Sequence, residues 1–134
     1  MSLFKPFAFE NVVVSGGGGG AFPLTTAFLS ATGITGSANI QALQDFETAL
    51  TTNSLTGKFT AIYPLIGGNS TAASYNFLNT AQYQVTWNGH VTFYKDGVQS
   101  TNYGDAYADT GIPCTSISPN EGHSTVWVLS LIHI

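Results

Sequence analysis

Two late aspartates are the first candidates for chemistry, because a pair of carboxylates can hydrolyse glycosidic bonds. Asp105 and Asp109 stand four positions apart, whereas glycoside hydrolases hold their two carboxyl groups about 5–9.5 Å apart. On an extended strand that rises about 3.3 Å per residue, this spacing gives a separation of about 13 Å. Unless a loop brings them closer, we expect turn and cap residues that bind backbone N–H groups, with Asp96 as a further turn residue.

Nucleophile, phosphate and metal chemistry have little support in the sequence. Gly16 to Gly20 is followed by Ala-Phe-Pro with no nearby Lys, so this run predicts a linker and not a phosphate loop. No Gly-X-Ser-X-Gly elbow is present, although a triad assembled in space stays open. The histidines lack the spacing of metal ligands: His90, His123 and His133. We therefore expect no catalytic residue, no metal and no cofactor.

A calcium site is a lesser alternative to this expectation. Asn102, Asp105 and Asp109 could offer hard oxygen ligands together with backbone carbonyls. The sequence has no EF-hand pattern that would support such a site. Cys114 is the single cysteine and predicts a small apolar filler.

The aromatic residues between positions 83 and 107 are the most suggestive group. Alternation favours the core for three of them, Tyr83, Trp87 and Phe93, and Tyr107 is expected to pack under a loop. Tyr94 and Tyr103 are the members that we expect to be exposed. Exposed rings can stack against sugars while amides and carboxylates bind the hydroxyls. The candidate glycan-binding residues are therefore Tyr94, Asn102, Tyr103 and Asp105.

Composition limits the class of protein. Only 7% of the 134 residues are charged, against roughly 25% in an ordinary soluble domain, and hydroxyl and amide residues replace the charges. Such a surface suits an exterior β-protein. The cations are three scattered lysines, Lys5, Lys58 and Lys95, which disfavours nucleic acid. No apolar run reaches the ~18–20 residues of a membrane span.

The positioning elements begin with helices. Residues 1–20 form an N-terminal segment and Gly-rich linker, and residues 21–128 form the domain. Pro23 at a first turn and Gly33 as a stop predict one short helix. A second helix over 37–53 begins with Ser37 as N-cap. Its apolar stripe consists of Ile40, Leu43, Phe46 or Glu47, and Leu50, with Asp45 and Glu47 facing away or sideways.

From Lys58 onward the sequence alternates with period two, which predicts strands. We expect strands over 58–65, 82–87, 91–94 and 98–101, with Asn88-Gly89 as a type I′ hairpin turn and Lys95-Asp96-Gly97 as a second turn. Shorter strands are expected over 107–110, 115–118 and 124–128. This pattern predicts a mainly β fold, a jelly-roll or β-sandwich, with one or two short N-terminal helices.

The end of the chain predicts truncation of that sandwich. Residues 129–134 read Leu-Ser-Leu-Ile-His-Ile, a string that looks like a translated sequencing adapter. We therefore expect 129–134 to be a non-native tail and the domain over 21–128 to be incomplete. The alternative is a genuine terminal strand over 126–134.

Several segments resemble phage and metagenomic tail-fibre-type proteins. They are residues 27–34 (AFLSATGI), 58–68 (KFTAIYPLIGG), Asn88-Gly89 and 106–110 (AYADT). The resemblance covers about residues 24–118, and its aromatic-Pro-apolar-apolar-Gly-Gly motif is moderately specific. It implies a concanavalin A-like (LamG-like) jelly roll in a virion protein. The chain departs from the family after Asn88-Gly89, where Val91 to Asp96 replaces a Thr-His-Ser-Ser-like stretch.

Together these features predict a non-enzymatic structural or adhesin-like domain on a phage tail or fibre. The expected localisation is the virion or another extracellular surface. Its expected partners are cell-surface glycans and other virion proteins, and an oligomer is compatible with them. A jelly-roll carbohydrate-active enzyme, hydrolase or lyase, and a ligand-free spacer are the two alternatives.

Overall fold

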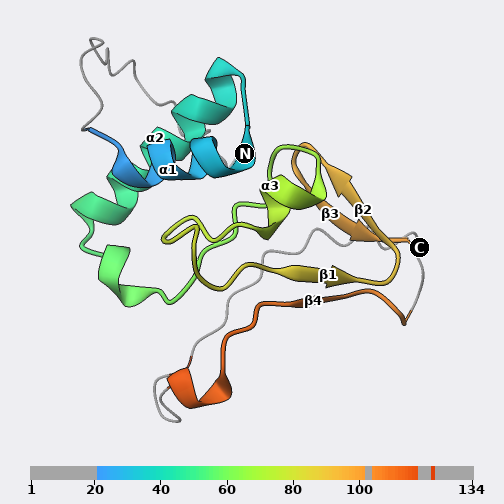
Figure 1. Cartoon of the computed structure of the whole chain (residues 1–134). Coiled ribbons are helices and arrows are strands. Elements are labelled where there is room, and N and C mark those ends of the chain that lie inside the picture. The colour runs from blue at the N-terminus through green and yellow to red at the C-terminus, as the bar shows by residue number, and fades with distance from the viewer. Residues whose placement is uncertain (1–20, 102–103, 118–121, 123–134) are drawn as a thin grey trace, which may run out of the picture.

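The computed structural model describes residues 21–101, 104–117 and 122 (Figure 1). The helices in this part of the chain are α1 (Pro23–Thr32), α2 (Ser37–Thr52) and α3 (Ser70–Ser74). The strands are β1 (Thr86–Asn88), β2 (Val91–Tyr94), β3 (Gly97–Ser100) and β4 (Tyr107–Asp109). Two 3-10 turns, η1 (Thr56–Lys58) and η2 (Cys114–Ser116), complete the order.

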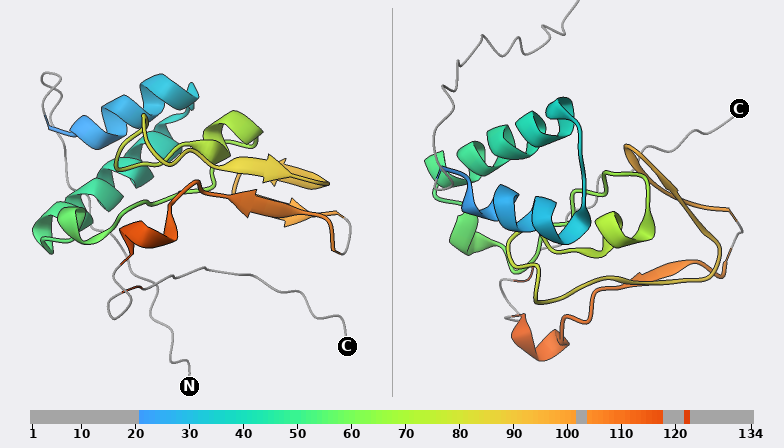
Figure 2. Two further views of the ribbon diagram at one scale, coloured as in Figure 1. Left: turned by 60° about the horizontal axis from the view of Figure 1, so that its bottom comes forward. Right: turned by 45° about the horizontal axis from the view of Figure 1, so that its top comes forward.

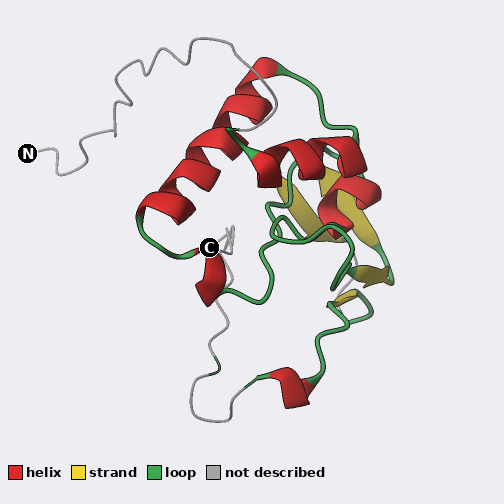
Figure 3. Cartoon of the chain, turned by 60° about the vertical axis from the view of Figure 1, so that its left-hand side comes forward, coloured by secondary structure: helices red, strands yellow, loops and turns green. Residues whose placement is uncertain are grey.

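The prediction of a mainly β, concanavalin A-like jelly roll is wrong. The described strands form two separate two-stranded antiparallel sheets, β1 with β4 and β2 with β3. The helices account for more of the described chain than these short strands do, as the colouring of Figure 3 makes plain. The described part of the chain is thus a small helical unit joined to two short β-ribbons.

Backbone conformation explains why alternation misled the strand prediction. Leu65 and Tyr83 both have positive φ, at 53° and 55°, and a strand needs φ near −120° to −140°. Over 59–65 the chain forms no ladder; instead the N–H of Ile62 donates to the Asn76 side chain at 3.1 Å. The expected strand over 82–87 is reduced to Thr86 to Asn88.

Of the two hairpin turns expected from the sequence, the first is wrong and the second is confirmed. Asn88-Gly89 does not join two paired strands, because β1 pairs with β4 and β2 pairs with β3. The second turn is confirmed: Tyr94 pairs with Gly97 across Lys95 and Asp96. The expected strand over 107–110 is confirmed as Tyr107 to Asp109.

Two expectations near the end of the described chain are wrong. The expected strand over 115–118 is replaced, where the structure describes it, by the 3-10 turn Cys114 to Ser116. Cys114 is exposed and does not fill a core. The segments 1–20, 124–128 and 129–134 lie outside the described residues.

The two long helices lie close to their expected positions. Pro23 opens α1, and Gly33 ends it with φ 68° while its N–H donates to the Leu29 carbonyl at 2.9 Å. The cap of α2 is Gly36, so Ser37 is the first helical residue and not the N-cap. The buried stripe of α2 is Leu43, Glu47 and Leu50.

The core lies among the helices and the segment after α3, not between sheets. It consists of Phe28, Ile34, Leu43, Leu50, Ala72 and Phe77. Phe28 and Phe77 meet edge to face with ring centroids 5.4 Å apart. Aromatic pairs prefer this arrangement. No helix in the described residues combines the length and apolarity that crossing a bilayer requires.

A backbone contact joins the β2–β3 hairpin to the helical unit. The N–H of Gly67 donates to the carbonyl of Lys95 in the hairpin turn at 3.3 Å. Gly67 has φ 97°, and a Cβ there would lie 2.9 Å from side-chain atoms of Ala72 and Ile34. Glycine therefore allows the loop before α3 to lie against both the core and the hairpin.

Candidate binding face on the β1–β4 ribbon

The register of β1 and β4 gathers four side chains on one side of the ribbon. Thr86 lies opposite Asp109, and Asn88 lies opposite Tyr107. Opposite residues of an antiparallel pair project to the same side, and so do residues two apart on one strand. These four residues, Thr86, Asn88, Tyr107 and Asp109, define what we term the Tyr107 face. Figure 2 shows β1 and β4 running side by side.

The opposite side of the ribbon faces the hairpin. Trp87 and Ala108 form the middle pair of the register and project away from the Tyr107 face. The Trp87 ring meets the Phe93 ring of β2 edge to face, at 5.4 Å between centroids. The prediction that Tyr83, Trp87 and Phe93 belong to the core is wrong: all three are only half-buried and none joins the core cluster, although Trp87 and Phe93 contact each other.

Tyr107 is the most exposed of the large hydrophobic residues in the described chain, at 62%. The expectation that it packs under a loop is wrong, because β4 is an exposed strand along its whole length. Neighbouring Cβ atoms across the ribbon lie about 4.5–5.5 Å apart, and residues two apart on a strand lie about 6.6 Å apart. The face therefore offers a ring and three polar side chains over an area suited to one sugar ring.

The polar members of the face are held by local hydrogen bonds. Asp109 accepts the N–H of Gly111 through Oδ1 at 2.9 Å, which confirms the prediction that this acid binds the backbone. Asn88 donates through Nδ2 to the Thr86 carbonyl at 3.3 Å. Within the described residues, no hydrogen bond engages Oδ2 of Asp109 or Oδ1 of Asn88. These oxygens can accept hydroxyl donors from a ligand.

His90 and Asp105 form an ion pair at the end of the ribbon, with His90 Nδ1 and Asp105 Oδ2 2.7 Å apart. Both side chains are largely exposed, so water screens the pair and its worth is about 0–1 kcal/mol. The N–H and hydroxyl of Thr101 both donate to the His90 carbonyl. With Nδ1 on the carboxylate, Nε2 is left to bind a ligand.

Gly89 allows this approach of the two segments. It has φ 74°, and a Cβ there would overlap the carbonyl oxygen of Asp105. The contact joins positions far apart in sequence, so no local pattern indicates the His90–Asp105 pair. His90 itself is exposed and lies in the bend between β1 and β2.

The structure separates two of the glycan-binding residues expected from the sequence. Tyr94 is exposed, as expected, but it ends β2 at the hairpin turn. Asp105 contacts His90, which precedes the first residue of β2. Four residues of extended chain place His90 and Tyr94 about 13 Å apart. Asn102 and Tyr103 lie outside the described residues.

The described residues contain no cluster of side chains that could form the alternative calcium site. No three His, Cys, Asp or Glu side chains there come together as a metal-binding group. Of the proposed calcium ligands, Asp105 is engaged by His90 and Asp109 by Gly111. The third, Asn102, is outside the described chain.

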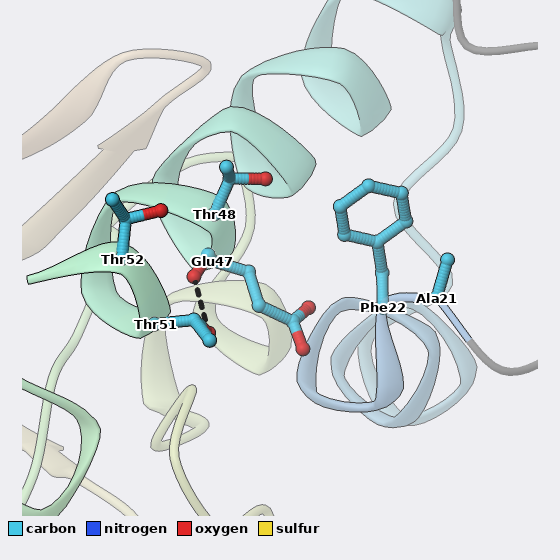
Figure 4. Close-up of a pocket in the computed structure, with 6 residues that line it drawn as sticks. All are labelled: Ala21, Phe22, Glu47, Thr48, Thr51 and Thr52. Carbon is cyan, nitrogen blue, oxygen red and sulfur yellow. Dashed lines mark hydrogen bonds between the residues drawn. The ribbon is translucent and has the colours of Figure 1, made fainter. Parts of the chain in front are cut away.

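A small pocket of about 160 Å³ lies apart from the ribbon, between α2 and the start of α1 (Figure 4). Its notable group is Glu47, only 5% exposed. Of the two alternatives for the stripe, Phe46 and Glu47, the buried one is therefore Glu47, and the expectation that this side chain faces away or sideways is wrong. Its carboxylate accepts the N–H groups of Leu24 at 3.0 Å and Thr25 at 2.8 Å. Thr51 donates to the Glu47 carbonyl at 2.9 Å. Because its carboxylate already caps α1, Glu47 has a structural role here.

The Tyr63 phenol marks the contact between the segment before α3 and the segment before β1. Its hydroxyl donates to the carbonyl of Tyr83 at 2.5 Å. Burial raises the pKa of Tyr63 above its ordinary value of 10.0, because the partly buried site disfavours the charged phenolate. The group is a structural donor at neutral pH.

Comparison with known proteins adds no relative to these observations. No protein-family model, no curated protein and no solved structure matches the chain.

Proposed function

We propose that this chain is a non-enzymatic binding domain of a particle surface, of the phage-tail type, and that it binds glycans on the Tyr107 face. The observation that carries the proposal is the exposed ring of Tyr107 beside Asn88, Asp109 and Thr86. A flat apolar ring can stack against the CH face of a sugar, while amide and carboxylate oxygens accept its hydroxyls.

Composition supports an exterior role for the domain. A chain with 7% charged residues depends on hydroxyl and amide groups for its hydration. The resemblance of residues 27–34 and 58–68 to tail-fibre-type segments supports the particle-surface assignment. It supports this assignment through short motifs only and contributes nothing to the choice of ligand.

The test is a glycan array followed by titration of the best ligand with the whole chain. Tyr107→Ala should weaken binding about tenfold or more, since each 1.4 kcal/mol of lost contact is a factor of ten. Phe59→Ala is the matched control, because Phe59 is also an exposed aromatic, at 46%, but lies outside the Tyr107 face. Its affinity should equal that of the wild type.

Tyr94→Ala separates this face from the residues first expected from the sequence. Loss of binding in Tyr94→Ala but not in Tyr107→Ala would locate the site at the hairpin turn and contradict the Tyr107 face. Silence of the folded protein across the array would favour a ligand-free spacer. Cleavage of a polysaccharide that is lost in Asp105→Asn or Asp109→Asn would favour the enzyme alternative.

A further inference from the structure

We infer that the Tyr107 face selects glycans ending in an uncharged sugar and excludes those whose terminal sugar carries a carboxylate, sulfate or phosphate. The inference rests on the proposed glycan-binding function and specifies its substrate class.

The charges around the face are predominantly negative. Asp109 belongs to the face, and Asp105 lies two residues before Tyr107 in the chain. Among the described residues, the cationic candidate beside it is His90, whose Nδ1 is already held by Asp105. An anionic sugar seated on Tyr107 would therefore meet a like charge at Asp109.

The two lysines of the described chain lie elsewhere. Lys95 is in the β2–β3 turn, at the end of β2 opposite to His90, and Lys58 ends η1. Neither belongs to the register pairs that form the Tyr107 face. No lysine within the described residues is thus placed on the ribbon to form a charge-assisted hydrogen bond with an anionic sugar.

The same carboxylate suits a neutral sugar. Asp109 is oriented by the Gly111 N–H on Oδ1, which leaves Oδ2 to accept a hydroxyl. Asn88 lies two register pairs away, diagonally across the ribbon from Asp109, with Oδ1 as a second acceptor. A sugar that carries hydroxyls on two sides of its ring can use both acceptors at once while its ring covers Tyr107, since diagonal neighbours on a ribbon lie about 7–8 Å apart.

The test compares two oligosaccharides that differ only in the terminal sugar: one ends in galactose, and the other is the same chain capped with sialic acid. Both are titrated into the whole wild-type chain at low and moderate salt. We expect the uncapped glycan to bind at least fivefold more tightly. The repulsion between two like charges about 4 Å apart weakens the affinity by about this factor even in water. Added salt should reduce the ratio of the two affinities, because it screens the repulsion.

Asp109→Asn is the decisive variant. It keeps an oxygen for the Gly111 N–H but removes the charge, so the preference for the uncapped glycan should shrink severalfold. Asp45→Asn is the matched control: it changes the net charge equally, on an exposed residue of α2, and should leave the ratio unchanged.

The outcomes separate the inference from the proposal on which it rests. Equal or tighter binding of the capped glycan by the wild type would overturn the selectivity but leave glycan binding intact. An equal loss of preference in Asp45→Asn would also overturn it, because the overall charge would then explain the effect. Binding of neither glycan, nor of any other on the array, would defeat the proposed function itself.

Discussion

The carboxylate of Glu47, on α2, accepts the backbone N–H of Thr25, in the first turn of α1, at 2.8 Å. Together with its bond to Leu24, this contact completes the start of α1. Pro23 has no N–H, and Thr26 donates to the Phe22 carbonyl at 2.9 Å. The positions from Pro23 to Thr26 are thus all accounted for, with Thr26 making the first intrahelical bond, although Phe22 provides no side-chain cap.

Replacing Glu47 should destabilise the domain through these donors. Glu47→Ala would leave two N–H groups at the positive end of α1 without their acceptor, at a cost of about 2 kcal/mol in the free energy of unfolding. Urea unfolding of the whole chain, followed by circular dichroism, measures the difference.

Asp45→Ala provides the matched control for this variant. Asp45 is an exposed acid on the same helix, and its carboxylate accepts only the Gln41 side chain among the described residues. Its loss should change stability by less than about 0.5 kcal/mol. If the two variants were equally stable, the interhelical cap would have no energetic importance.

Gly89 should be far less tolerant of a side chain than Gly111. Both have positive φ, at 74° and 63°, but only at Gly89 would an added Cβ collide with backbone atoms, those of Asp105 and Ala106. Gly111→Ala should cost about 1–2 kcal/mol from backbone conformation alone. Gly89→Ala should cost more, because the β1 and β4 segments must also move apart. Urea midpoints for both variants check this expectation; equal losses would contradict it.

The stability of the domain should fall above pH 10 partly through Tyr63. Burial raises the pKa of Tyr63 in the fold, so the unfolded chain loses this proton at a lower pH than the folded one. The resulting stabilisation is complete below pH 10 and is lost as pH rises through the folded pKa.

Tyr63→Phe removes that titration together with the hydrogen bond to Tyr83. We expect the variant to be about 1 kcal/mol less stable at pH 7 and to depend less steeply on pH above 10. Urea unfolding across pH 7 to 11 compares the two chains. Curves that remain parallel above pH 10 would contradict a role for Tyr63 in the alkaline loss.

The helices were predictable from the sequence because their signals are local. Pro23 and Gly33 mark the limits of α1, and the spacing of Leu43 and Leu50 follows one helical face. The prediction for Glu47 failed because a charged residue normally avoids the core. It lies inside because α1 supplies N–H donors from 22 and 23 residues away, which no pattern within α2 reveals.

The sheet and the candidate site depend on contacts between distant segments, which the period-two alternation of apolar residues does not predict. A period-two pattern indicates an extended strand but does not identify the strand with which it pairs. The prediction that Asn88-Gly89 joins two paired strands failed for this reason. β1 pairs with β4 where Gly89 approaches Asp105 closely, a contact between segments distant in sequence. The packing predicted for Tyr107 failed because β4 is exposed along its whole length, which the residues around Tyr107 do not indicate.

The glycine contact at the hairpin turn has a mechanical consequence. Gly67 donates to the Lys95 carbonyl, and a Cβ on Gly68 would lie 3.5 Å from the Lys95 nitrogen. Tension applied to the hairpin therefore reaches the loop before α3 directly through backbone atoms.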